Sequence, residues 1–423
     1  MYALFMALYL ILFYKSYWGI FDRMFFSVIN EVGGAFCVWL LWYRQSLKPE
    51  FGWSFIFTDL ALVTGLIIAR QIPIVKLESA KVGDVRQRVD GISEFDTFLF
   101  VVSVGYVIVE MLSMATIGFV LLNRAENHAS AFSEHGILRA FVSSFRFLLI
   151  MVLFYKKVVL NRNWSLMDIF CSVFLLIGVL TSGAKAAILS FVFIYFMVSY
   201  PLIHSNQIKK IKISPMLALV LGSFPILVLM ISVRTNAVTA LQQVYVRLLA
   251  SGDIFLLGYY DDVMNYIKET SFFRYAFYPG WGSVLKNLGF TIQAPRPLGA
   301  YIFEYYTKAT MGGGPNARHN YLGLYFFGFY GSILYSFIIG LIIGYVRNSF
   351  KSVNALKSSY FIYFFFLILA YYMPYMIDDL NLFANSIFWT NLFFCLSFVV
   401  AKIIHSVMKA IVYAKSPARY QMD

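Results

Sequence analysis

Long apolar stretches separated by short polar segments recur along the whole chain. Many of them approach or exceed the roughly 18–20 apolar residues that an α-helix needs to cross a bilayer. The pattern predicts about eleven membrane helices, and hence an all-α polytopic integral membrane protein. The predicted spans cover residues 2–14, 24–43, 54–70, 96–122, 139–155, 165–181, 184–203, 215–234, 319–345, 359–377 and 384–401.

The composition of the 423 residues supports this fold class, because 60% are apolar and only 13% are charged. Soluble domains are about half apolar and a quarter charged. The net charge of +13 comes from 34 Lys and Arg against 21 Asp and Glu. Much of the basic charge falls in short alternate loops, such as Lys209–Lys212, which the positive-inside rule places in the cytoplasm. The charge therefore reports topology, and no aromatic-basic strand motif indicates a nucleic-acid partner.

The same rule divides the chain into three predicted parts. Residues 1–234 form the N-terminal membrane helices, and residues 319–423 form the C-terminal helices and a basic cytoplasmic tail. Residues 235–318 form a large loop on the opposite side of the membrane. Within it, "VYVRLLASGDIFLLGYY" (244–260) is amphipathic and typical of a helix that lies against a membrane. A large, half-apolar outside loop suits an enzyme whose substrate has a lipid tail.

Ionisable side chains in or beside apolar spans are costly in a membrane, so each marks a candidate functional position. Five such groups from separate segments are predicted at the outer interface: Lys185, Arg234, Arg247, Arg318 and His319. Arginine binds phosphate as a fork and lysine binds it as a point charge. Together the five groups could hold a lipid-linked pyrophosphate. Each one alone is also explained by a side chain that reaches toward the lipid headgroups.

Other candidates could supply acid–base chemistry or structural pairing. Asp253 could pair with Arg247 or accept a proton from a sugar hydroxyl. His319 could be a general base, a neutral donor to phosphate, or a helix cap. Arg146 lies inside a predicted span and could extend the phosphate site, or Glu110 on the preceding span could pair with it structurally.

Motifs of several other chemistries are missing from the sequence. It contains no P-loop, Gly-x-Ser-x-Gly, Gly-x-Gly-x-x-Gly or zinc-ligand spacing. The adjacent pair Asp261 and Asp262 does not form the Asp-x-Asp of metal-dependent nucleotide-sugar transferases. The glycines at 312–314 are followed by Pro315 and no lysine, which indicates a hinge. We therefore expect no cofactor and no metal ion.

Several segments together resemble a known family. They are "TSGAKAAILSF" (181–191), "RLLASGDIFLLGYY" (247–260), the long outside loop, and "GPNARHNYLGLYFFGFYG" (314–331). These features are similar to those of the Wzy-type O-antigen polymerases of Gram-negative inner membranes. His319, Asn320, Gly328 and Gly331 also resemble a motif of the O-antigen ligases, which share the fold. The seven residues between Asn320 and Gly328 form a shorter spacing than in ligases, which favours the polymerase.

The resemblance implies a GT-C type helical bundle of about 11–12 transmembrane helices with one large periplasmic loop. It implies a glycosyltransferase that works without nucleotide or metal at the periplasmic face. The donor is a growing glycan on undecaprenyl pyrophosphate, and the acceptor is a repeat unit on a second such lipid. Further implied partners are a Wzz-type chain-length regulator and the membrane lipids.

The predicted site gives each candidate residue a role. His319 and Asp253 are the catalytic candidates, and Asn320 and Glu110 support the site. The predicted pyrophosphate-binding residues are Lys185, Arg146, Arg234, Arg247 and Arg318.

Three alternatives stay open. The first is an O-antigen ligase that transfers glycan to lipid A core, and the second is another lipid-phosphosugar transferase. The third is a lipid-linked oligosaccharide flippase. Transporters are usually built from halves with matching broken helices, and the sequence shows no such halves.

Overall fold

Helices form nearly all the regular structure in a computed structural model of the chain. The structure describes residues 1–73, 88–89, 92–119, 135–181, 187–207, 239, 242, 246, 250–269, 271–291, 295–308, 314–355 and 358–415. Seven helices in these ranges are long and apolar enough to cross a membrane. The prediction of a helical, multi-pass membrane protein is thereby confirmed.

Ten of the eleven predicted spans fall on described helices, and the span 215–234 lies outside the described residues. The helices before residue 208 are α1 (Tyr2–Leu12), α2 (Arg23–Tyr43), α3 (Pro49–Ile68), α4 (Glu94–Ile117), α6 (Gly136–Val158), α7 (Leu166–Thr181) and α8 (Ala187–His204). The later spans correspond to α15 (His319–Lys351), α16 (Tyr360–Tyr372) with α17 (Tyr375–Asp378), and α18 (Leu380–Lys415).

Two helices extend beyond the membrane spans predicted on them. The backbone stays helical to Lys351 in α15 and to Lys415 in α18, well past the predicted ends at 345 and 401. Loss of hydropathy marks the end of an apolar span, whereas a helix ends at a breaker such as Pro or Gly. The sequence of α18 contains neither residue, so the helix continues through its basic positions.

The chain divides into two compact units, each assembled from distant segments. The first unit comprises Met1–Val75, Gly222–Ser349 and Leu369–Phe388. The second unit comprises Lys76–Leu221, Phe350–Ile368 and Trp389–Asp423. The predicted three-part division, which concerns the two sides of the membrane, stays a prediction.

Segments of the predicted outside loop fold as helices within the first unit. They are η1 (Ala250–Gly252), α11 (Asp253–Gly258), α12 (Asp261–Tyr266), α13 (Phe272–Asn287) and α14 (Leu298–Thr307). The backbone of η1 lies directly on α2, since a Cβ on Gly252 would be 2.4 Å from the carbonyl oxygen of Gly33. The ring of Phe255 meets that of Phe55 on α3 edge to face, with centroids 4.9 Å apart. This part of the loop is therefore packed into the helical core of the unit.

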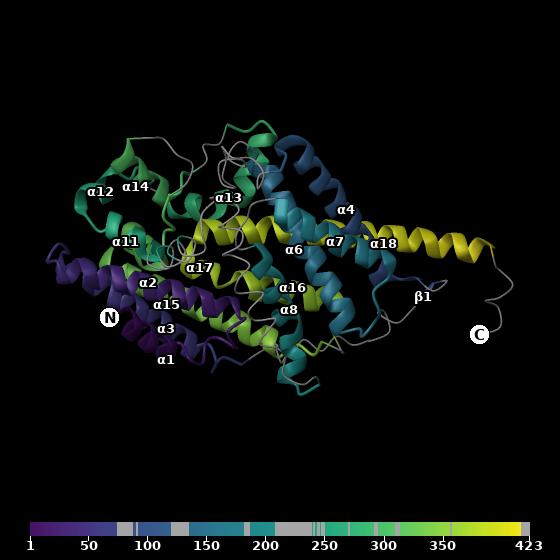
Figure 1. Ribbon diagram of the computed structural model, residues 1–423, viewed down its shortest axis with the longest axis horizontal. Coiled ribbons are helices and arrows are strands. Elements are labelled where there is room, and N and C mark those ends of the chain that lie inside the picture. The colour runs from purple at the N-terminus through teal and green to yellow at the C-terminus, as the bar shows by residue number, and fades with distance from the viewer. Residues whose placement is uncertain are drawn as a thin grey trace. The chain divides into compact units, whose positions relative to one another are not determined.

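Small residues bring α3 and α15 into close contact in the same unit (Figure 1). The two helices carry matching segments, "GLIIA" at 65–69 and "GLIIG" at 340–344. A Cβ on Gly65 would be 2.3 Å from the carbonyl oxygen of Phe337, and one on Gly340 would be 2.2 Å from that of Leu62. Small residues spaced in this way allow membrane helices to pack backbone to backbone.

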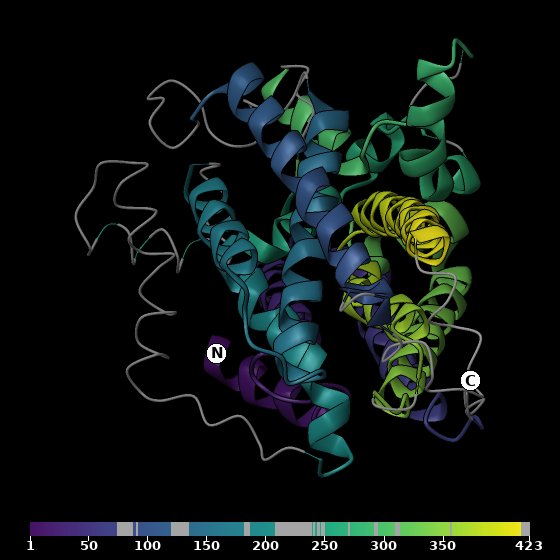
Figure 2. The same ribbon diagram turned by 90° about the vertical axis from the view of Figure 1, so that its right-hand side faces the viewer.

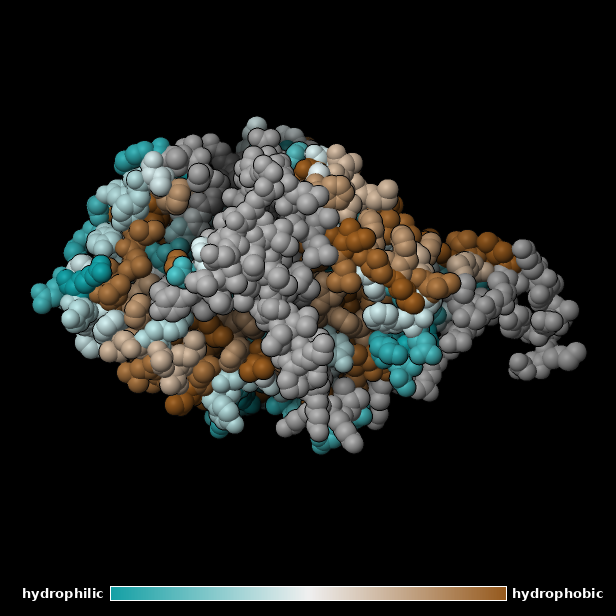
Figure 3. Space-filling model, in the orientation of Figure 1, coloured by the Kyte–Doolittle hydropathy of each residue, from teal (hydrophilic) through white to brown (hydrophobic). Residues whose placement is uncertain are grey.

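In the second unit, α6 packs against both α4 and α8, as the teal and blue helices of Figure 2 show. The helix α4 starts with a capping box, in which Ser93 and Asp96 satisfy each other's backbone N–H groups. A short antiparallel pair, β1 (Arg88–Val89) and β2 (Ile92–Ser93), leads into this cap. Apolar side chains cover much of the described surface in Figure 3, as expected for helices that face lipid.

Candidate functional site

Five ionisable side chains meet in the interior of the first unit. We name them the Arg318 cluster, and all five are at most 9% exposed. Its members come from four helices and the residue before one of them: Glu31 on α2, Asp59 on α3, Arg318, His319 at the start of α15, and Asp378 at the end of α17. Ionisable groups among apolar membrane helices are costly and generally functional. The cluster is therefore the strongest candidate site in the described residues.

Arg318 is the cation of the cluster and is held on two sides. Its Nη1 donates to Glu31 Oε1 at 2.8 Å and to Asp378 Oδ1 at 3.1 Å. Its Nη2 donates to the backbone carbonyl of Ser251 in η1 at 2.6 Å. Asp378 also accepts from Ser27 Oγ at 2.7 Å. These contacts connect the buried charges directly to the loop segment that packs on α2.

His319 and Asn320 form the other side of the cluster. His319 Nδ1 lies 2.9 Å from Ser336 Oγ, and His319 Nε2 lies 3.6 Å from Asp59 Oδ1. Asn320 Nδ2 donates to Asp59 Oδ1 at 2.7 Å. Tyr9 donates its hydroxyl to the other oxygen of Asp59. The carboxylate of Asp59 is thus fixed by two neutral donors and faces the imidazole.

Three buried atoms of the cluster lack a hydrogen bond to any described residue. They are Glu31 Oε2, Arg318 Nε and His319 Nε2. A buried polar atom without a partner costs about 1–3 kcal/mol, and such atoms in native proteins often mark a bound species or a reactive group. Glu31 and His319, together with Asp59, offer ligand atoms that all lie within 4.8 Å of one another.

Carboxylates outnumber cations in the cluster. Glu31 and Asp378 pair with the single guanidinium of Arg318, and Asp59 faces His319. A second guanidinium, that of Arg23, lies 4.2 Å from the ring centroid of Tyr375 and near Asp378. Counting Arg23 as well, the site has three carboxylates and two guanidiniums, so its formal charge is negative.

The structure brings together only part of the predicted site. Arg318, His319 and Asn320 all belong to or support the cluster, and all are buried, which the sequence did not predict. Asp253 begins α11 and lies near enough to Arg318 to interact electrostatically. The predicted Lys185, Arg234 and Arg247 lie outside the described residues.

Arg146 and Glu110 belong to the second unit and form the predicted ion pair. Arg146 Nη2 lies 3.0 Å from Glu110 Oε2 and 3.2 Å from Oε1, and it also donates to the carbonyl of Gly178 at 3.3 Å. A Cβ on Gly178 would be 2.6 Å from the Glu110 carboxylate. The ion pair can therefore pack against α7 because residue 178 has no side chain. The pairing is confirmed, while a role for Arg146 in phosphate binding stays a prediction.

Sequence reasoning missed the three carboxylates of the cluster. Glu31, Asp59 and Asp378 each stand in an apolar stretch, in "VINEVGG", "FIFTDLALV" and "YMIDDL". An ionisable residue inside a predicted span was the signal that could have found them. Their convergence on Arg318 could not be read from the sequence, because it depends on the packing of α2, α3 and α17.

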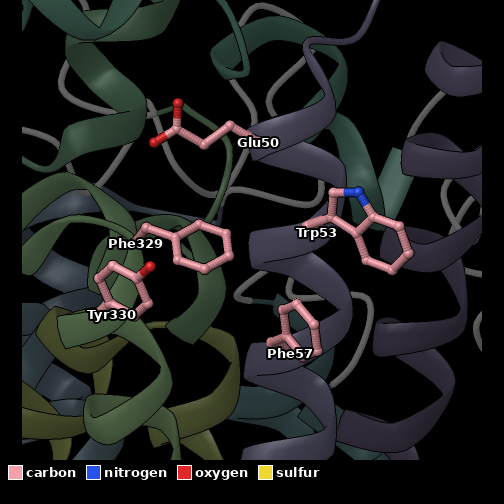
Figure 4. Close-up of a pocket in the computed structure, with 5 residues that line it drawn as sticks. All are labelled: Glu50, Trp53, Phe57, Phe329 and Tyr330. Carbon is pink, nitrogen blue, oxygen red and sulfur yellow. The ribbon is translucent and has the colours of Figure 1, made fainter.

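A second feature of the first unit is an aromatic groove between α3 and α15, with a volume of about 540 Å³. Figure 4 shows Glu50, Trp53 and Phe57 from α3 and Phe329 and Tyr330 from α15 around it. The three α3 residues recur at helical spacing and so share one face of that helix. The groove is therefore apolar along its length, with a single carboxylate at one end.

Comparison of the chain with protein-family models, curated proteins and solved structures gave no match.

Proposed function

We propose that the protein is a glycosyltransferase that polymerises undecaprenyl-pyrophosphate-linked oligosaccharide units. The observation that supports this proposal best is the Arg318 cluster, where acid–base groups and a guanidinium are buried among membrane helices and contact the long loop. The proposal includes a GT-C type bundle in a Gram-negative inner membrane, with the site facing the periplasm. It also includes a Wzz-type chain-length regulator as partner.

The proposed reaction needs two kinds of group, and the cluster contains both. A hydroxyl of the acceptor sugar attacks the anomeric carbon of the donor, while the bond from that carbon to the lipid pyrophosphate breaks. The hydroxyl proton passes to a base, for which His319, Glu31 and Asp59 are chemically competent. The charge that develops on the departing pyrophosphate needs a preorganised cation, which Arg318 supplies in part.

The guanidinium of Arg318 is not free to bind a substrate in this structure. Both of its terminal nitrogens are occupied by Glu31, Asp378 and the carbonyl of Ser251. An incoming pyrophosphate therefore competes with two carboxylates for the guanidinium. Binding is favoured when one of these carboxylates loses its charge or takes another partner.

The aromatic groove has a place in the same proposal as the site of a polyprenyl chain. Aromatic rings and an apolar lining suit an unsaturated hydrocarbon, and Phe329 and Tyr330 follow the Arg318 cluster along α15. A Trp53→Ala, Tyr330→Ala double variant should raise KM for a long-chain donor more than for a short-chain analogue. Equal effects on both donors would argue against this placement.

The test is to incubate the purified protein with one lipid-linked repeat unit and separate the products on a gel. We expect a ladder of lengthened glycans from the parent protein. The variants Glu31→Gln, Asp59→Asn and His319→Gln each remove one candidate base. The variant that removes the true base should form glycans about 10²–10⁴-fold more slowly. Asp22→Asn is a matched control, because Asp22 is a buried carboxylate of the same unit that pairs with Arg347 outside the cluster.

The alternatives give different outcomes in the same assay. Transfer that requires lipid A core as acceptor would identify a ligase. Movement of labelled lipid across liposomes without any lengthening would identify a flippase. If the folded protein does neither and yields no ladder, the proposed polymerase is rejected.

A further inference from the structure

The proposed reaction needs one base, and it leaves unexplained why three candidate groups, Glu31, Asp59 and His319, converge. These three side chains come from α2, α3 and α15 and are at most 4% exposed. Each offers one ligand atom, and the three atoms lie within 4.8 Å of one another. We propose that Glu31, Asp59 and His319 bind a divalent transition-metal ion, of the Mn²⁺ or Zn²⁺ type.

The distance between His319 and Asp59 favours a shared cation over a direct hydrogen bond. His319 Nε2 and Asp59 Oδ1 are 3.6 Å apart, beyond the usual range of about 2.7–3.2 Å for an N–H···O bond. Two ligands bound at about 2.0–2.2 Å to one tetrahedral ion lie roughly 3.4 Å from each other. The observed separation is therefore close to that of two ligands of one metal.

The unpartnered atoms point to the same conclusion from separate observations. His319 Nε2 and Glu31 Oε2 are buried and have no hydrogen-bond partner among the described residues. His319 Nδ1 lies 2.9 Å from Ser336 Oγ, and in the tautomer whose Nδ1 donates this hydrogen bond, Nε2 carries a lone pair that can bind a metal. A metal-bound histidine usually has its second nitrogen held in this way.

The surroundings supply the supporting contacts and the charge that a metal site needs. Asn320 and Tyr9 both donate to Asp59 and fix the orientation of its carboxylate, as groups around metal ligands commonly do. The excess of carboxylates in the Arg318 cluster would be offset by a divalent ion. The imidazole favours Zn²⁺ over Mg²⁺ and Ca²⁺, which prefer oxygen ligands, and the two carboxylates also suit Mn²⁺.

The metal site would also resolve a difficulty of the proposed function. A pyrophosphate is anionic and would be repelled by a site with excess carboxylate, whereas a bound divalent ion would attract it. This consequence rests on the proposed function, and it departs from the metal-independent reaction that the family resemblance implies. The metal site itself rests on geometry alone and is tested without substrate.

The experiment uses the full chain, purified in detergent with its affinity tag removed. The protein is stripped with EDTA, equilibrated with Mn²⁺, Zn²⁺ or Mg²⁺, desalted, and analysed for bound metal by mass spectrometry. We expect about one Mn²⁺ or Zn²⁺ per chain, much less Mg²⁺, and a higher melting temperature in the loaded form.

Variants locate the ion. Glu31→Gln and His319→Gln should abolish stoichiometric binding, and Asn320→Ala should weaken it about 10- to 100-fold. The matched controls Asp22→Asn and His405→Gln should bind as the parent does. Absence of stoichiometric metal in the folded parent overturns the inference, as does unchanged binding in both ligand variants.

The metal inference and the proposed function can fail separately. A glycan ladder that forms equally well in EDTA supports the glycosyltransferase and contradicts a metal role in it. Stoichiometric metal binding without any ladder supports the site and contradicts the proposed reaction.

Discussion

At the scale of single residues, the buried guanidinium of Arg318 is held between the carboxylates of Glu31 and Asp378. Replacing Arg318 with Gln removes the guanidinium from both buried carboxylates and leaves Glu31 without its ion-pair partner. Breaking a buried ion pair in this way costs about 3–5 kcal/mol. We expect the melting temperature of Arg318→Gln in detergent to fall sharply, with a partial recovery when Glu31→Gln is added.

The matched control for this prediction is Arg274→Gln. Arg274 also forms an ion pair, with Glu269 at 2.9 Å, but its side chain is 42% exposed. Exposed pairs contribute about 0–1 kcal/mol. Similar losses for Arg274→Gln and Arg318→Gln would show that the cluster does not stabilise the unit as its burial implies.

Gly328 is the second residue whose role follows from its local geometry. It interrupts α15 with φ 68° and ψ −171°, a region of backbone conformation that essentially only glycine adopts. No atom lies within 4 Å of a Cβ placed there, so the cost of Gly328→Ala is backbone strain, about 1–3 kcal/mol. We expect its melting temperature to drop by several degrees.

Gly136→Ala provides the comparison for Gly328→Ala. Gly136 starts α6, its added Cβ also meets no atom within 4 Å, and its φ is not in the left-handed region. Alanine there should be neutral or slightly stabilising. A Gly328→Ala protein as stable as Gly136→Ala would contradict the kink.

The residues of the candidate site were only partly predictable from the sequence. Arg318 and His319 were identified because they stand at the start of an apolar span. The burial of these two residues was not predicted. The sequence shows where a charge falls along the chain, but it does not show which distant side chain faces that charge. The pairing of Glu110 with Arg146 was predictable because adjacent spans in sequence pack side by side.

At the scale of elements, the contact between α3 and α15 depends on the absence of side chains. Gly65 and Gly340 each place backbone of one helix against the other, with no space for a Cβ. Gly340→Leu must separate the helices, and overpacking of this kind costs about 1–3 kcal/mol. We expect a lower melting temperature and reduced metal or substrate binding, because α3 and α15 carry Asp59 and His319.

A bulky change on the exposed side of the same helix is the control for Gly340→Leu. Ile342 is 39% exposed, so Ile342→Phe should change the melting temperature little. Equal destabilisation by Gly340→Leu and Ile342→Phe would contradict the prediction. It would show that a larger side chain destabilises α15 equally on its exposed side and on the side that packs against α3.

The elements themselves were largely visible in the hydropathy pattern. Ten predicted spans coincide with helices because about 18–20 apolar residues can satisfy their backbone in a bilayer only as a helix. The ends of α15 and α18 were not visible, since helix termination depends on breakers and caps. The packing of η1 and α11 onto α2 was also hidden, because it depends on close contacts at Gly33, Gly34 and Gly252 between segments more than 200 residues apart.

At the scale of the whole molecule, the two units draw their helices from interleaved parts of the chain. The first unit needs segments from the beginning, the middle and the end of the sequence. Hydropathy reports each span separately, so the sequence could predict the membrane class without predicting this division. Topology is therefore the property of the whole chain that the sequence predicts most directly, through its basic loops.

The topology prediction follows from the positive-inside rule. The loop 235–318 carries the Ser251 carbonyl that contacts Arg318, so the side of the membrane on which it lies decides which substrates can reach the cluster. Alkaline phosphatase, which folds only outside the cytoplasm, should be active when fused after Gly289 and inactive when fused after Asn206. A cytoplasmic reporter such as green fluorescent protein should give the opposite result at the same two positions. Activity of the phosphatase at Asn206 alone would place the loop in the cytoplasm. Nucleotide-linked substrates are present there, whereas lipid-linked repeat units that face the periplasm are not. This result would remove the basis for the proposed polymerase.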